Sequence, residues 1–198
     1  DWACFLTGVQ RQLRKHVNEN VTISFDSASA FLSTANGLVY THNLFTPKRW
    51  SYIMEKAPDD KKLKGSTIPF PFKSAIGERL TMGDVCAYGE GDLNKNNKEG
   101  KTSWDSFSYC LMMAHNVYNH IRAVQIANDM NDIEMVKHKP DIDAWTKTKA
   151  SDNTGELSDF VPKNILYFNQ FVEKVFTSEK PMEYISANKS FLADIRGT

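Results

Sequence analysis

The chain has 198 residues, and its 24 basic and 24 acidic side chains leave no net charge at pH 7. A neutral chain has no global field that attracts nucleic acid, so any contact with a polyanion must be a local patch. No stretch approaches the roughly 18 apolar residues of a membrane helix, and the first residues do not form a signal peptide. Three cysteines without close spacing favour a reducing compartment. We therefore expect a soluble, cytoplasmic protein without a membrane partner.

The first part of the chain predicts two strand–helix units in succession. Trp2–Leu6 is a short apolar run that ends near Gly8 and predicts a strand, and residues 9–17 carry apolar side chains at helical spacing. Val21–Phe25 alternates apolar and polar residues and predicts a second strand. A strand, a helix and a strand joined by short loops imply a parallel pair, so Gly8 and Asp26 are expected at the same edge of a sheet.

The remainder predicts a polar loop region and then helices. Residues 58–103 are rich in Gly, Pro, Asn and charged side chains, which is typical of exposed loops. Residues 104–130 and 163–176 repeat apolar side chains every three or four positions, and each predicts an amphipathic helix, whereas residues 137–155 predict a loop. We expect three segments: 1–57, 58–103 and 104–198.

Two short motifs carry a resemblance to a known family. The string Phe25-Asp26-Ser27-Ala28-Ser29 follows the second predicted strand, and Ala114-His115-Asn116 lies on the long amphipathic stretch. In this order they resemble the archaeal type of tRNA-guanine transglycosylase. The resemblance implies an α/β fold, namely the C-terminal portion of a (β/α)₈ TIM barrel with its last two strand–helix units and a helical extension. A complete barrel needs about 250 residues, so we expect the chain to act with a missing N-terminal barrel half or a partner chain.

The resemblance also implies an activity and its residues. The family exchanges a guanine in nucleic acid for a 7-deazaguanine base, and divergent phage and bacterial paralogues act on DNA, so tRNA and DNA are both open as substrates. Asp26 corresponds to the nucleophile that forms a covalent ribosyl ester, which is chemistry suited to a carboxylate. Gly8 matches a turn that approaches the base, and Val9 and Ser27 are the other expected substrate-binding residues. Without the resemblance, Asp26 would be interpreted as a helix-capping residue and Gly8 as the end of a strand.

This chain departs from the pattern of the family's structural zinc site. Its Cys-x-Cys-x-x-Cys and later His correspond to Asp84, Cys86, Gly89 and His115, so two thiolates are missing. Further ligands would have to come from Glu90, Asp92 or His42. We predict that the chain holds no zinc and no other cofactor.

Two alternative functions remain open. The chain could be a non-catalytic barrel subunit or nucleic-acid-binding module that supports a partner, although a subunit without catalysis has no need for Asp26. It could also be another aspartate-dependent glycosyl hydrolase. That reaction requires a second carboxylate near the first, and Asp84 and Glu90 are the candidates.

Overall fold

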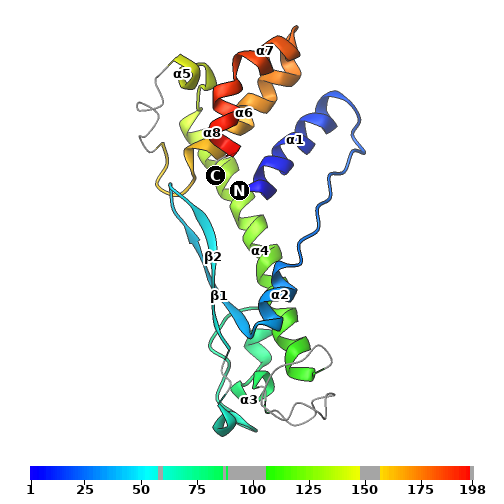
Figure 1. Ribbon diagram of the computed structural model, residues 1–198, viewed down its shortest axis with the longest axis vertical. Coiled ribbons are helices and arrows are strands. Elements are labelled where there is room, and N and C mark those ends of the chain that lie inside the picture. Colours follow the sequence, from blue (N-terminus) through cyan, green and yellow to red (C-terminus); the bar gives the residue numbers. More distant parts are fainter. Residues whose placement is uncertain (58–59, 87, 89–105, 148–156, 197–198) are drawn as a thin grey trace. The chain divides into compact units, whose positions relative to one another are not determined.

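The computed structural model describes residues 1–57, 60–86, 88, 106–147 and 157–196 (Figure 1). Within these ranges the chain is mainly helical. The elements in chain order are α1 (Trp2–His16), α2 (Ser29–Ala35), β1 (Leu38–Phe45), β2 (Trp50–Lys56), the 3-10 helices η1 (Lys61–Leu63) and η2 (Gly77–Arg79), α3 (Met82–Val85), α4 (Phe107–His138), α5 (Ile142–Lys147), α6 (Lys163–Thr177), α7 (Pro181–Ala187) and α8 (Lys189–Arg196). None of the described helices is long and apolar enough to cross a membrane.

The predicted α/β barrel portion is wrong. The sheet of the described residues contains only β1 and β2, which residues 46–49 join as an antiparallel hairpin (Figure 1). The expected strand at Trp2–Leu6 belongs to α1, and the expected strand at Val21–Phe25 has no regular secondary structure. The described residues therefore contain no parallel strand–helix–strand unit.

Two backbone groups of the Val21–Phe25 segment bond to side chains of α1. The Gln10 amide oxygen accepts a hydrogen bond from the Ile23 N–H at 2.6 Å. Arg14 Nε donates to the Val21 carbonyl at 2.8 Å. A strand must satisfy its backbone groups in a ladder, and here α1 side chains satisfy two of them instead.

The two long predicted helices are confirmed. The stretch predicted at 104–130 forms α4, which continues to His138, and the stretch predicted at 163–176 forms α6. The helix α5 begins at Ile142, inside the predicted loop at 137–155. Of the predicted loop region at 58–103, the structure describes 60–86 and 88, and these contain η1, η2 and α3.

The chain forms two compact units. Unit 1 comprises residues 1–25, 45–50 and 124–198, and unit 2 comprises residues 26–44 and 51–123. Both α4 and the hairpin contribute residues to each unit.

Unit 1 has an aromatic-rich core between α1, α5, α6 and α8. The Phe5 ring lies 4.5 Å from the Phe168 ring, and the Phe191 ring lies 5.2 Å from Trp145 and 5.5 Å from Phe171. Such contacts between aromatic rings stabilise the core beyond the contribution from burial of apolar area. At the edge of this core, Arg11 of α1 forms a two-pronged ion pair with Asp132 of α4.

Gly8 permits the close approach of α1 and α6. A Cβ atom at this position would overlap the side-chain oxygen of Asn169, which is itself held by a 2.8 Å hydrogen bond from Asn169 Nδ2 to the Ile165 carbonyl. A side chain at this position would therefore require the Asn169 amide to move. Gly8 is buried within α1 and does not end a strand.

Unit 2 has a smaller apolar core formed by Val39, Phe70, Leu80, Val85 and Met112. Several of these residues come from the segment predicted as an exposed loop. A bridge between Pro69 and Thr81 and the capping box between Thr81 and Asp84 hold this segment in a defined conformation.

Candidate functional site

The four residues predicted from the resemblance are divided between the two units. Asp26 and Ser27 belong to unit 2, where both are exposed, and Gly8 and Val9 belong to α1 of unit 1. The Ser27 hydroxyl lies 2.6 Å from the Ser29 hydroxyl at the start of α2. Val9 packs against the core of unit 1. The surroundings of Gly8 and Val9 are therefore other side chains of unit 1.

His115, part of the second motif, is completely buried at the centre of a polar network in unit 2. Its Nε2 lies 2.9 Å from the Tyr40 carbonyl oxygen, and its Nδ1 lies 2.8 Å from the Ser74 hydroxyl. Because a carbonyl only accepts, Nε2 carries the proton and Nδ1 accepts the hydrogen bond of Ser74. The Ser74 oxygen in turn accepts from the Gly77 N–H at 2.6 Å.

Burial lowers the pKa of His115 below its ordinary value of 6.5, although the hydrogen bond to Tyr40 raises it in part. The imidazole is therefore neutral near pH 7, in agreement with its hydrogen bonds. Gly77 allows this arrangement, since a Cβ atom there would overlap the Phe72 carbonyl oxygen and lie 3.1 Å from His115 Nδ1.

Asn116, the next residue, is also completely buried and connects three elements of unit 2. Its side-chain oxygen accepts from the Tyr40 N–H at 2.8 Å. Its amide nitrogen donates to the Leu38 carbonyl at 2.9 Å and to the Thr34 hydroxyl at 2.8 Å. Together with His115, Asn116 bonds to the edge of β1 that faces away from β2, as a third strand would.

The His115–Asn116 network stabilises the structure of unit 2, and its burial prevents a substrate from reaching its reactive groups. Ser74 and His115 have the hydrogen bond of a nucleophile and its base, but they are 5% and 0% exposed. Both imidazole nitrogens and the Ser74 oxygen are engaged in hydrogen bonds within the protein. A substrate cannot reach this pair without unfolding the segment around it.

The positions that correspond to the family's zinc ligands have separate structural roles. Asp84 caps α3, and the Cys86 sulfur donates to the Asp60 carbonyl at 3.4 Å. Gly89, Glu90 and Asp92 lie outside the described residues. Over the part of the chain that the structure describes, no group of three or more His, Cys, Asp and Glu side chains could hold a metal ion. The absence of zinc stays a prediction.

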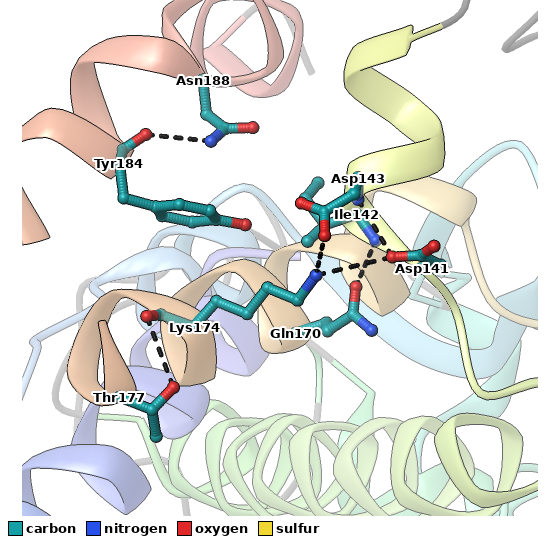
Figure 2. Close-up of polar contacts among 8 residues, drawn as sticks. All are labelled: Asp141, Ile142, Asp143, Gln170, Lys174, Thr177, Tyr184 and Asn188. Carbon is teal, nitrogen blue, oxygen red and sulfur yellow. Dashed lines mark hydrogen bonds and ion pairs between the residues drawn. The ribbon is translucent and has the colours of Figure 1, made fainter. Parts of the chain in front are cut away.

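A second polar cluster lies in unit 1 between α5, α6 and α7 (Figure 2). Lys174 of α6 forms ion pairs with Asp143 and, at 3.5 Å, with Asp141. Burial lowers the pKa of Lys174, but the hydrogen bond to Asp143 and the charges of both carboxylates together raise it by more. The pKa therefore lies above its ordinary value of 10.5. The nearby Gln170 side-chain oxygen accepts from the Ile142 N–H. We call these residues, with Tyr184 and Asn188, the α5–α6–α7 cluster.

Tyr184 and Asn188 contribute a hydroxyl and an amide group to this cluster. The Tyr184 ring stacks on Phe171 at 5.8 Å, and burial raises the pKa of its hydroxyl. Asn188, which ends α7, is 3% exposed. The Tyr184 hydroxyl forms a hydrogen bond with Asp143, which also raises its pKa. The Asn188 side-chain oxygen is buried without a hydrogen-bond partner among the described residues. Figure 2 shows the two oxygens on the side of these residues that faces α5.

The α5–α6–α7 cluster was not predicted from the sequence. Its residues come from three helices, two of which are short, and their spacing matches no motif. The only signal was the local pair Asp141 and Asp143, which is common at the start of a helix. Comparison of the chain with protein-family models, curated proteins and solved structures finds no match.

Proposed function

We propose that this chain supplies the nucleophilic carboxylate, Asp26, of a nucleic-acid guanine transglycosylase acting on tRNA or DNA. The proposal starts from the two motifs that resemble the family. The Asp26 side chain is exposed, and it forms no hydrogen bond or ion pair with the described residues. A carboxylate with this exposure is available to a substrate.

One observation supports the proposal more than any other. The His115–Asn116 motif holds the segment that follows Asp26, through hydrogen bonds to Thr34, Leu38 and Tyr40. Asn116 and Leu38 are 78 residues apart in the chain. Asp26 and the second motif thus belong to one unit, and Asn116 bonds to the helix and strand that follow the first motif in the chain.

In this reaction a carboxylate oxygen of Asp26 forms a bond to C1′ of the ribose or deoxyribose while the bond from C1′ to the guanine nitrogen breaks. The incoming 7-deazaguanine then attacks C1′ and releases the carboxylate, so no redox partner is needed. We assign the proton donor for the leaving guanine and the base-recognition groups to a partner polypeptide.

The test is base exchange by the chain in its native assembly, isolated through a tag on this chain. Asp26→Asn should lower incorporation of labelled guanine into tRNA or DNA by about 10³-fold or more, because an amide cannot form the ester. Glu55→Gln is the matched control, since Glu55 is also an exposed carboxylate of unit 2.

A covalent adduct provides the second measurement. We expect the native chain, denatured during turnover, to carry a nucleotide ester on the peptide that contains Asp26. Undiminished exchange by a folded Asp26→Asn variant would refute the assignment and favour a supporting, non-catalytic role.

A further inference from the structure

The two edges of the β1–β2 hairpin differ in how their backbone groups are paired. An edge strand carries a row of N–H and C=O groups with which another strand can pair. On the outer edge of β1, Asn116 bonds to the Tyr40 N–H and the Leu38 carbonyl. His115 bonds to the Tyr40 carbonyl on the same edge. Side chains of α4 therefore close the β1 edge.

The outer edge of β2 is identified by the backbone groups that face β1. The N–H of Ala57, just after β2, donates to the Gly37 carbonyl at 2.7 Å. The Ile53 carbonyl accepts from the Thr41 hydroxyl of β1 at 3.3 Å. Successive residues of a strand direct their backbone groups to opposite sides, so the even-numbered residues of β2 direct theirs away from β1. In unit 2 these outward residues are Tyr52, Met54 and Lys56.

No described group pairs with the outer edge of β2. The sheet of the described residues contains only β1 and β2, and no hydrogen bond outside the hairpin uses the backbone of the three outward residues. Tyr52 is 39% exposed, and Lys56 is exposed as well. Proteins protect such edges with Pro or charged side chains, but β2 has no Pro and its charges lie only at its end. The group that pairs with this row is another extended strand.

A second copy of β2 matches this edge. An antiparallel pair centred on Met54 places Met54 opposite Met54 of the second copy, and Tyr52 opposite Lys56. Outward residues that lie directly opposite exchange both hydrogen bonds, so every outward N–H meets a carbonyl. On the other face Glu55 lies opposite Ile53, and no like charges meet. A register centred on Lys56 would instead place two ammonium groups opposite each other, which is unfavourable.

We propose that β2 pairs with β2 of a second copy of this chain, with the twofold axis at Met54. The two hairpins then form one continuous antiparallel sheet, and the same surface is used by both copies. The association concerns unit 2 and needs no reaction at Asp26, so it is independent of the transglycosylase proposal.

The first test is sedimentation of the 198-residue chain over a range of concentrations, where we expect a reversible dimer. Met54→Lys and Met54→Glu each place like charges at the axis and should weaken association about tenfold or more, whereas a mixture of the two variants should associate more tightly than either alone. Leu44→Lys is the matched control, because Leu44 is an exposed apolar residue of β1. A monomeric native chain, or a dimer that both Met54 variants leave unchanged, would overturn the proposal.

Hydrogen exchange tests the pairing itself. We expect the outward N–H groups of Tyr52 and Met54 to exchange more slowly in the native dimer than in folded Leu44→Lys protein diluted to the monomer. The Ile53 N–H, which faces β1, should be protected in both states. Equal exchange of the outward groups in dimer and monomer would overturn the proposal even if the chain dimerises, since the contact would then lie elsewhere.

Discussion

The His115–Asn116 network of unit 2 and the α5–α6–α7 cluster of unit 1 are both polar, but they differ in how deeply their side chains are buried. His115 and Asn116 are completely buried, and both nitrogens of His115 and both polar atoms of the Asn116 amide have protein partners. In the cluster, the side chains of Lys174, Asp143 and Asp141 are 32%, 47% and 63% exposed.

This difference decides how strongly each region contributes to stability. A completely paired, buried network stabilises one backbone arrangement, and removal of any member leaves others unsatisfied. Ion pairs between partly exposed side chains contribute less, because water solvates each charge when its partner is removed. Mutations should therefore have large effects on folding in the first region and small effects in the second.

The largest effect is expected for Asn116→Ala. This change leaves the Tyr40 N–H and the Leu38 carbonyl without their partner, and it removes the donor to the Thr34 hydroxyl, which still donates to the Ala30 carbonyl. We expect the free energy of unfolding to fall by about 3 kcal/mol or more, as measured by urea denaturation. The control is Asn128→Ala on the same helix, where the side chain donates only to the Val124 carbonyl within the helix. Similar losses in the two variants would contradict the anchoring role of Asn116.

Gly8→Ala should have the next largest effect. The added methyl group overlaps the Asn169 side chain, and we expect a loss of about 1–3 kcal/mol from overpacking, reduced by the higher helix propensity of Ala. The double variant Gly8→Ala/Asn169→Ala should recover part of this loss in a double-mutant cycle. If the two changes were simply additive, the contact between α1 and α6 would not be the reason for Gly8.

A smaller effect is expected from the protonation of His115. Its pKa is lowered in the folded state, so below the ordinary value of 6.5 the unfolded chain binds a proton that the folded chain resists. The stabilising contribution is complete above about pH 6.5 and decreases as the pH falls, by at most about 1.4 kcal/mol per pH unit.

The measurement is the free energy of unfolding between pH 7.5 and 5 for the native chain and for His115→Gln. The variant should lose part of the slope. A remaining part belongs to His120, whose pKa burial also lowers. An unchanged slope in His115→Gln would show that the imidazole does not resist protonation in the folded chain.

The smallest effect is expected for Tyr184→Phe. The Tyr184 hydroxyl bonds to Asp143, whose side chain is half exposed, so water can replace the lost hydrogen bond. The free energy of unfolding should therefore fall by no more than about 1 kcal/mol. Thermal and urea unfolding test this directly, and a loss as large as that of Asn116→Ala would contradict the comparison.

The long helices were predictable from local pattern. Both α4 and α6 repeat apolar side chains over many turns without Gly or Pro, and such a pattern is compatible with few other structures. The hairpin was missed, although two runs rich in aromatic and β-branched residues flank a turn that contains Pro47, which is a recognised signal. The sequence also identified His115 and Asn116 as notable residues, but not their partners Ser74, Thr34 and Tyr40.

The remaining errors have a common physical reason. The apolar residues of Trp2–Leu6 suit a strand or a helix equally well, and the choice depended on whether Cys4 and Phe5 could be buried against α6. Val21–Phe25 alternates as a strand does, yet a strand requires a neighbour, and its backbone bonds instead to Gln10 and Arg14. The sequence by itself determined where long amphipathic helices form, because that information is local. The tertiary structure decided the hairpin, the pairing of His115 and Asn116 and the α5–α6–α7 cluster, because each depends on residues that are distant in the chain.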